Sequence, residues 1–172
     1  DLVRSRGLGD VYKRQEYNHA EKLESEVKIL NQYDLSRYIT AQQRDYQSAL
    51  TEIKNGKKVS HWMWYIFPQI RGLGKSSISQ FYAIQSLDEA RAFLEHPYLG
   101  HNIIEISEAL LSLDTSDAYE VFGRPDNMKL KSSMTLFARA SEDNQVFLNV
   151  LDKYFKGKRD FRTLKILENM EK

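Results

Sequence analysis

The residues best suited to chemistry lie between His61 and Ser77, where donors and cations surround two glycines. The polar members of this first block include His61, Gln69, Arg71, Lys75 and Ser76, and its glycines are Gly72 and Gly74. Successive backbone N–H groups in such a turn, with cations nearby, form a concavity that binds anions. The first block therefore predicts an anion site, and the alternative is a tight turn that only joins two buried segments.

The tripeptide Gly74-Lys75-Ser76 resembles the end of a phosphate-binding loop but fails two of its requirements. That motif needs a glycine five positions before Gly74, where the sequence has Gln69, and it needs a preceding strand. Pro68 instead ends a predicted helix, because the residue before a proline is displaced from the α region. We therefore reject an ATPase.

A second block, residues 129–135, is also rich in cations and hydroxyl groups. Its polar members are Lys129, Lys131, Ser132, Ser133 and Thr135. Two such blocks meeting across a cleft would form a positively charged pocket for an anionic small molecule, phosphate-bearing and nucleotide-like. We expect at least two of the cations Arg71, Lys75, Lys129 and Lys131 to share one cleft with His61 or Gln69. The competing expectation is that each cation points to solvent or pairs with a carboxylate such as Asp126 or Glu105.

Two tryptophans, Trp62 and Trp64, stand in the first block and offer planar faces on which a base or another planar ligand stacks. Helical spacing places them on different faces of the predicted helix at 61–67. We expect one of them to line a site and the other to be buried.

Catalysis has weak candidates in His61, Ser132 and Ser133. At the start of a helix the dipole favours the neutral form of His61, which a general base needs, but a purely structural role is the leading interpretation. Ser132 or Ser133 with His61 as base would form a hydrolase pair, yet the nucleophile-elbow pattern is missing. Whether the protein is an enzyme stays open. His19, His96 and His101 have no metal-binding spacing with His61, so we expect neither a metal nor a cofactor.

The run from His61 to Ser77, His-Trp-Met-Trp-Tyr-Ile-Phe-Pro-Gln-Ile-Arg-Gly-Leu-Gly-Lys-Ser-Ser, resembles the signature of the family called domain of unknown function 1810. Further matching segments are Phe81-Tyr82-Ala83-Ile84, residues 89–100 and residues 129–137. The resemblance covers about residues 33–167. It implies an all-helical fold and no established activity. Some relatives carry the label calpastatin, but nothing here has the disordered, repetitive character of a protease-inhibitory repeat.

Composition narrows the possible partners. The 172 residues include 25 basic and 24 acidic side chains, giving a net charge of +1. Residues 1–15 contribute four basic and two acidic side chains, so the remainder has a net charge of −1 and offers no electrostatic basis for nucleic-acid binding. The lack of cysteine excludes disulfides and thiolate metal sites and fits a cytoplasmic location. No apolar run approaches the ~20 residues of a membrane span, so no membrane partner is expected.

The first 32 residues are of uncertain origin. Residues 5–15 resemble a translated sequencing-library adapter, and residues 10–15 match the transposon end codon for codon. We expect residues 1–15 to be a disordered tail without function. Residues 16–32 are charged with a weak helical pattern, and are either an N-terminal helix or a frayed read-through.

Residues 33–172 predict one all-α domain of about seven or eight helices. A stripe from Leu35 to Ile53 predicts the first, with Asp34 as its N-cap and Asn55-Gly56 as its end. Ser60 is the expected N-cap of a short buried helix at 61–67. Further helices are expected near residues 86–95, 99–113, 116–122, 125–140, 144–155 and 160–167, with an apolar segment at 78–84. An all-helical domain also suits a second function, a protein-interaction module that uses an outer helix face.

Overall fold

The computed structural model describes residues 18–24 and 33–172. The expectations for residues 1–15, and most of those for 16–32, lie outside the described residues. The chain divides into two compact units at residues 34 and 35, and the second unit, Leu35–Lys172, contains both blocks.

The unit is built from helices, and the only β-type pairing among the described residues is one isolated bridge. The helices are α2 (Ser36–Lys54), α3 (Met63–Ile66), α4 (Ser77–Tyr82), α5 (Leu87–Glu95), α6 (Pro97–Leu111), α7 (Ala118–Phe122), α8 (Asp126–Ala140), α9 (Gln145–Phe155) and α10 (Phe161–Met170). With the helical segment at 18–24, the described residues hold ten helical segments, so the expected count of seven or eight was too low. Helix α4 has six residues, too few for a periodic stripe to reveal it, and this part of the chain was expected only as an apolar segment.

Two predicted helix starts were wrong. Helix α2 begins at Ser36 with Leu35 in the N-cap position, not Asp34. Helix α3 begins at Met63 with Trp62 in the N-cap position, so Ser60 does not cap it and His61 lies before the helix. Neither N-cap residue makes a side-chain cap hydrogen bond, since neither leucine nor tryptophan has a side-chain oxygen that could accept one.

Other helix ends follow the sequence signals. Ser86 accepts a hydrogen bond from the Glu89 N–H at 3.1 Å and begins α5, as the first half of a capping box does. His96 begins α6 through Nδ1, which accepts from the Tyr98 and Leu99 N–H groups at 3.2 and 3.3 Å. Asp160 caps α10.

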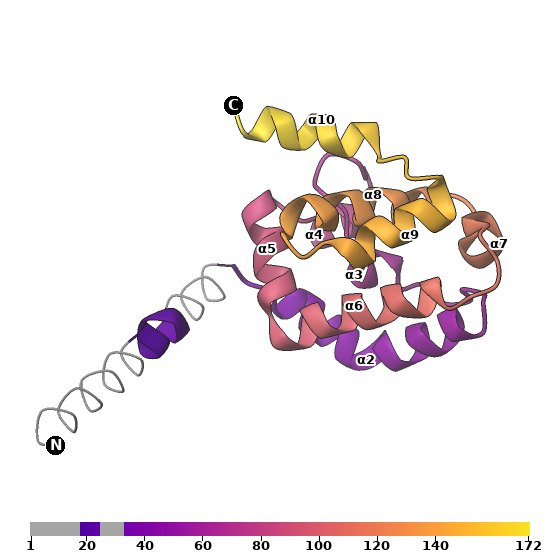
Figure 1. Ribbon diagram of the computed structural model, residues 1–172, viewed down its shortest axis with the longest axis horizontal. Helices are drawn as coiled ribbons and strands as arrows, with labels where there is room; N and C mark the ends of the chain where they lie inside the picture. The colour runs from indigo at the N-terminus through magenta and orange to yellow at the C-terminus, as the bar shows by residue number, and fades with distance from the viewer. Residues whose placement is uncertain (1–17, 25–32) are drawn as a thin grey trace, which may run out of the picture. The chain divides into compact units, whose positions relative to one another are not determined.

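The helices pack in a compact arrangement with α6 against α2 on one side and α8 beside α9 on the other (Figure 1). Helix α5 contacts both α6 and α8, while α10 lies over α8. The first block passes through this core as expected, since Trp62 and Phe67 are at most 1% exposed. Their rings meet that of Phe122 from α7, with centroids 6.0–6.4 Å apart.

After α3 the chain pairs briefly with a later segment. The Arg71 N–H donates to the Ile84 carbonyl at 2.9 Å, and the Ile84 N–H donates to the Gln69 carbonyl at 2.8 Å. The glycine turn and α4 therefore leave the core and return to it at one point. In the described part of the chain, no helix is both long enough and apolar enough to cross a membrane.

Candidate functional site

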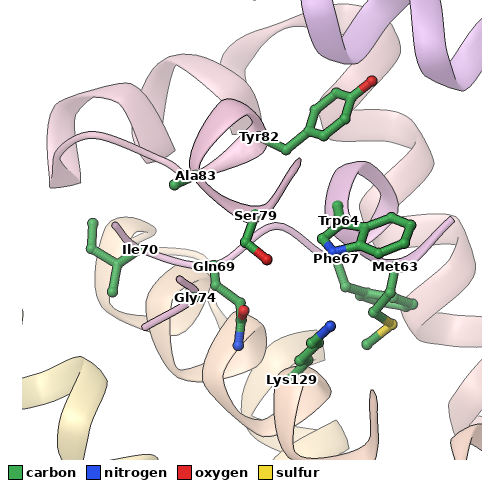
Figure 2. Close-up of a pocket in the computed structure, with 10 residues that line it drawn as sticks. All are labelled: Met63, Trp64, Phe67, Gln69, Ile70, Gly74, Ser79, Tyr82, Ala83 and Lys129. Carbon is green, nitrogen blue, oxygen red and sulfur yellow. The ribbon is translucent and has the colours of Figure 1, made fainter. Parts of the chain in front are cut away.

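A small pocket lies where the first block meets α8 (Figure 2). Its lining residues are Met63, Trp64, Phe67, Gln69, Ile70, Gly74, Ser79, Tyr82, Ala83 and Lys129. The cavity volume is about 10 Å³, room for about one water molecule. The pocket therefore brings the two blocks together, but only Lys129 represents the second.

Lys129 is the only charged side chain that lines this pocket. Its ammonium lies 5.4 Å from the centroid of the Trp64 ring, within cation–π range. It also lies 3.5 Å from Asp126 Oδ1, a long ion pair, and the side chain is 23% exposed. In Figure 2 the ammonium points toward Trp64 from α8.

Asp126 is shared by two lysines, and Lys58 is the nearer one. The Lys58 ammonium lies 2.9 Å from Asp126 Oδ2 and donates to the Ser60 carbonyl at 2.6 Å, with its side chain only 8% exposed. One carboxylate thus stands between two ammonium groups and is paired mainly with Lys58. The charge of Lys129 is left incompletely neutralised at the pocket.

Two pocket donors have no protein partner. Within the described residues, neither the Gln69 amide nor the Trp64 indole N–H makes a hydrogen bond. Gln69 and Trp64 are half-buried, so these donors face the pocket from its walls. Unpaired donors beside a cation favour a ligand rich in hydrogen-bond acceptors.

The loop before α3 is fixed by Glu52 of α2. Its Oε1 accepts from the Val59 and Ser60 N–H groups at 2.6 and 2.7 Å and from the Trp62 indole N–H at 3.0 Å. Burial opposes ionisation of Glu52, but these hydrogen bonds outweigh it and hold its pKa below the usual value. Glu52 thereby sets the direction in which the chain enters α3.

Helix α3 is itself held against α2 through Tyr65. The Gln42 amide donates to the Tyr65 carbonyl at 2.8 Å, and the Tyr65 hydroxyl donates to Asp45. Burial and the bond to Asp45 raise the pKa of Tyr65 to about 12, so the phenol stays protonated. These contacts position Trp64, which lies between Met63 and Tyr65 in the sequence.

The structure does not bring the four predicted cations together. Arg71 and Gly72 line a separate, open hollow with Ile166 of α10, whose cavity volume is about 470 Å³. Lys75 is exposed and lines neither pocket, and the Lys131 ammonium lies 6.0 Å from the Phe155 ring centroid, over α9. The expectation of two of these cations in one cleft with His61 or Gln69 is not met, because nearby residues of the turn and of α8 point to different sides.

Ser76 caps the start of α4 and does not line the pocket. Its hydroxyl accepts from the Ser79 N–H at 3.2 Å and donates to the Ser79 hydroxyl at 2.7 Å. Gly74 is a lining residue, and a Cβ there would lie 2.5 Å from the Cβ of Ser79. Glycine is therefore needed at 74 for the turn to close onto α4.

The hydroxyls of the second block hold α10 in place. Ser132 donates to Asp160 Oδ2 at 3.1 Å, and the Asp160 N–H donates to the Thr135 hydroxyl at 2.9 Å. Asp160 Oδ2 also accepts from the Thr163 N–H at 3.0 Å and hydroxyl at 2.5 Å. Ser133 is fully buried and its hydroxyl has no hydrogen-bond partner. These residues do not line the pocket.

The weak catalytic pair also fails on geometry. His61 is exposed, whereas Ser132 and Ser133 are at most 6% exposed, and no hydrogen bond joins them in the described part of the chain. The carbonyl of His61 accepts from the Tyr65 hydroxyl at 3.3 Å. Among the residues that the structure describes, no three or more His, Cys, Asp or Glu side chains lie close enough together to hold a metal ion.

One of the comparisons with known proteins identifies the family. The model of the family described as Protein of unknown function (DUF1810) matches residues 32–167. The chain belongs to this family. Among solved structures, it is similar to the conserved hypothetical protein Rv1873 from Mycobacterium tuberculosis, with a TM-score of 0.78 and 45% identity over 79% of this chain and 97% of that one. No curated protein matches.

Several residues of this DUF1810 member matter at the site although the sequence did not single them out. Ser79 and Tyr82 line the pocket, but the segment at 78–84 was expected to be apolar, and Tyr82 was noted only within the family-like run Phe81-Tyr82-Ala83-Ile84. In the sequence, Lys58 is noticeable only as one of two adjacent lysines, Lys57 and Lys58, that precede the first block. Asp126 was named as a possible partner of the cations, and it does pair with Lys129. The signal that could have identified Ser79 and Tyr82 is their spacing, because Ser76, Ser79 and Tyr82 follow one another at intervals of three residues.

Proposed function

We propose that the protein binds an anionic, phosphate-bearing small molecule at the pocket between the first block and Lys129. The observation that carries the proposal is the charge of the lining: one lysine and no carboxylate. An ammonium held in a half-buried site without full neutralisation is costly, and an anion removes that cost.

The donor set supports the same class of ligand. Lys129, the Gln69 amide and the Trp64 indole N–H offer donors of different geometry on neighbouring walls. Phosphate and carboxylate oxygens accept several such bonds at once. The exposed part of the Trp64 ring adds a planar surface for a base or sugar ring, which makes a nucleotide-like ligand the best fit.

The test is a thermal-shift panel of inorganic phosphate, sugar phosphates and nucleoside monophosphates. A compound at 100 times its dissociation constant should stabilise the protein by ~2.7 kcal/mol. For a domain of this size that corresponds to a rise in melting temperature of roughly 5–10 °C.

A matched pair of variants locates the site. Lys129→Ala should weaken a compound that gives a shift by about 5- to 100-fold, because a charge-assisted hydrogen bond is lost. Lys131→Ala, two residues along the same helix but over Phe155, should leave the affinity unchanged. Equal effects of the two variants would refute the pocket as the binding site.

The second candidate, a protein-interaction module, is favoured by the exposed apolar face of α4. Ile78 and Phe81 are 40% and 58% exposed and lie one turn apart. This candidate predicts that Phe81→Ser abolishes capture of a protein partner while leaving the phosphate panel unaffected.

A further inference from the structure

Residues 71–83 form a loop whose two ends meet. The reciprocal hydrogen bonds between Arg71, Ile84 and Gln69 close its base, at 2.9 and 2.8 Å. A surface segment of this length with adjoining ends has the form of an Ω-loop, a type that is often functional. Within it lie the glycine turn and α4.

The loop is held more weakly than the helices around it. None of the α4 residues is buried, whereas α3, of only four residues, buries three. Segments with few buried apolar contacts open at a lower free energy than the core does. The 71–83 loop is therefore the part of the pocket wall that moves most readily.

Four of the ten lining residues belong to this loop: Gly74, Ser79, Tyr82 and Ala83. The rest come from α3, the segment after it and α8. Because the closed cavity holds about one water molecule, a phosphate ester does not fit until part of the wall moves. Moving this loop uncovers Trp64, Gln69 and Lys129 together.

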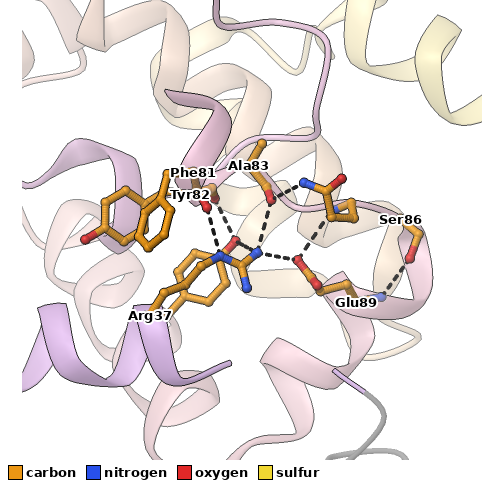
Figure 3. Close-up of polar contacts among 8 residues, drawn as sticks. Arg37, Phe81, Tyr82, Ala83, Ser86 and Glu89 are labelled. Carbon is orange, nitrogen blue, oxygen red and sulfur yellow. Dashed lines mark hydrogen bonds and ion pairs between the residues drawn. The ribbon is translucent and has the colours of Figure 1, made fainter. Parts of the chain in front are cut away.

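The contacts that hold the loop shut gather at its C-terminal end (Figure 3). Arg37 of α2 donates from Nε to the Phe81 carbonyl at 2.9 Å and from Nη2 to the Ala83 carbonyl at 3.2 Å. Its position is fixed by an ion pair with Glu89 at 2.8 Å. The Tyr38 hydroxyl donates to the Tyr82 carbonyl at 2.6 Å.

The N-terminal end of the loop has the more adaptable backbone. Gly72 has φ +98°, a conformation that glycine adopts without strain, and Gly74 follows two residues later. Its turn rests against Ile166 of α10 at the edge of the open hollow. The loop therefore has glycines at one end and an anchor of hydrogen bonds at the other.

We propose that the 71–83 loop is a lid that opens to admit the ligand and closes over it. Opening breaks the hydrogen bonds from Arg37 and Tyr38 and swings the α4 end outward, while the glycine end of the loop acts as the hinge. The purpose of the lid rests on the proposed function, but its opening is a property of the protein alone and is measured without ligand.

Hydrogen exchange on the unliganded full chain tests the lid, with two variants that each delete one phenol. Tyr38→Phe removes the bond to the Tyr82 carbonyl at the lid, and Tyr154→Phe removes a bond of 2.5 Å to the Leu110 carbonyl elsewhere. Tyr38→Phe should raise the exchange rate of amides in residues 72–83 about fivefold. Tyr154→Phe should leave those amides unchanged, and α8 should exchange more slowly than the lid in every variant.

The result that overturns the lid is equal exchange of residues 72–83 and α8, or the same response of the lid to both variants. A second measurement adds inorganic phosphate or adenosine monophosphate at saturating concentration. Protection of residues 72–83 by either probe supports the lid as the cover of the binding site. If the lid exchanges fast but neither probe binds, the proposed ligand class fails while the lid stands.

Discussion

The pocket and the α8–α10 junction draw on the same kinds of polar residue but use them differently. At the junction, Ser132, Thr135 and Thr163 all bond to Asp160, and every one of these hydroxyls has a partner. At the pocket, Gln69 and Trp64 have donors without a partner among the described residues, and Lys129 has a long ion pair with Asp126. Polar groups at the junction are paired and hold two helices together, whereas those at the pocket are not fully paired.

This difference shows that residue type alone does not separate a binding site from a structural joint. The second block looked like a ligand site because of its lysines and hydroxyls, yet Ser132 and Thr135 bond to Asp160 at the start of α10. A buried polar group that is already hydrogen-bonded has little left to offer a ligand. Substitutions in both regions test this difference.

The largest effect is expected for Asp160→Ala. The change removes the N-cap of α10 and takes the acceptor from the Thr163 N–H and hydroxyl, while Ser132 keeps only the Met128 carbonyl, so unfolding should become easier by about 2–3 kcal/mol. Urea denaturation measures this loss. Asp160→Asn keeps a cap and should lose less, and Gln69→Ala at the pocket should change stability by no more than about 0.5 kcal/mol. Equal losses for Asp160→Ala and Gln69→Ala would abolish the distinction between the two regions.

Gly74→Ala should have the next largest effect, and a local one. A Cβ at 74 would lie 2.5 Å from the Cβ of Ser79, so the turn and α4 must separate, at a cost of about 1–2 kcal/mol. Because both groups belong to the 71–83 loop, the damage should stay there. Hydrogen exchange should quicken in residues 72–83 and stay unchanged in α8 and α10. Uniformly faster exchange would mean that the loop is as much a part of the core as the junction is.

Replacing each of the two adjacent serines, Ser132 and Ser133, should change stability by smaller amounts that differ from each other. Ser132→Ala should lower stability by about 1 kcal/mol because it deletes the bond to Asp160. Ser133→Ala should be neutral or slightly stabilising, since the buried Ser133 hydroxyl has no partner to lose. Thermal denaturation of both variants decides the point. A clear loss at Ser133 would show that its hydroxyl has a role that the hydrogen bonds do not reveal.

The smallest effect is expected at His96, whose hydrogen bonds to the start of α6 require an unprotonated Nδ1 and therefore depend on pH. Its Nδ1 caps α6 as an acceptor, and burial lowers the pKa of the imidazole below its ordinary value. The neutral form is favoured in the folded protein, so this stability is present above the ordinary histidine pKa of ~6.5 and is lost as the pH falls through the lowered pKa. His96→Asn caps without titrating. Between pH 7.5 and 5, wild type should lose up to about 1 kcal/mol more than this variant.

Much of the fold could be predicted from the sequence because its signals are local. Stripes of apolar residues marked the long helices, and Ser86 and Asp160 marked the starts of α5 and α10. The start of α3 was missed because it depends on the side chain of Glu52, eight residues before Ser60 and ten before Trp62, and no local pattern shows which groups that carboxylate will bind. Arg37 and Phe81 could not be paired in advance, since 44 residues separate them.

The site was harder to predict because it depends on which way each side chain points. Lys129 and Lys131 are two residues apart on one helix, and only packing decides that the first reaches Trp64 and the second reaches Phe155. Arg71 and Lys75 were grouped with them by composition, but the glycine turn directs Arg71 toward α10. His61 was placed inside a helix that begins two residues later.

The two tryptophans differ in burial, so the intrinsic fluorescence of the protein can report on the pocket. Trp62 is 1% exposed and bonded to Glu52, whereas Trp64 is half-buried at the pocket beside Lys129. These are the only tryptophans in the chain, so intrinsic fluorescence combines one shielded emitter and one accessible emitter. An aqueous quencher such as iodide should reach Trp64 alone, and a molecule seated in the pocket should block that quenching. Occupancy can thus be followed by light emission without attaching a dye.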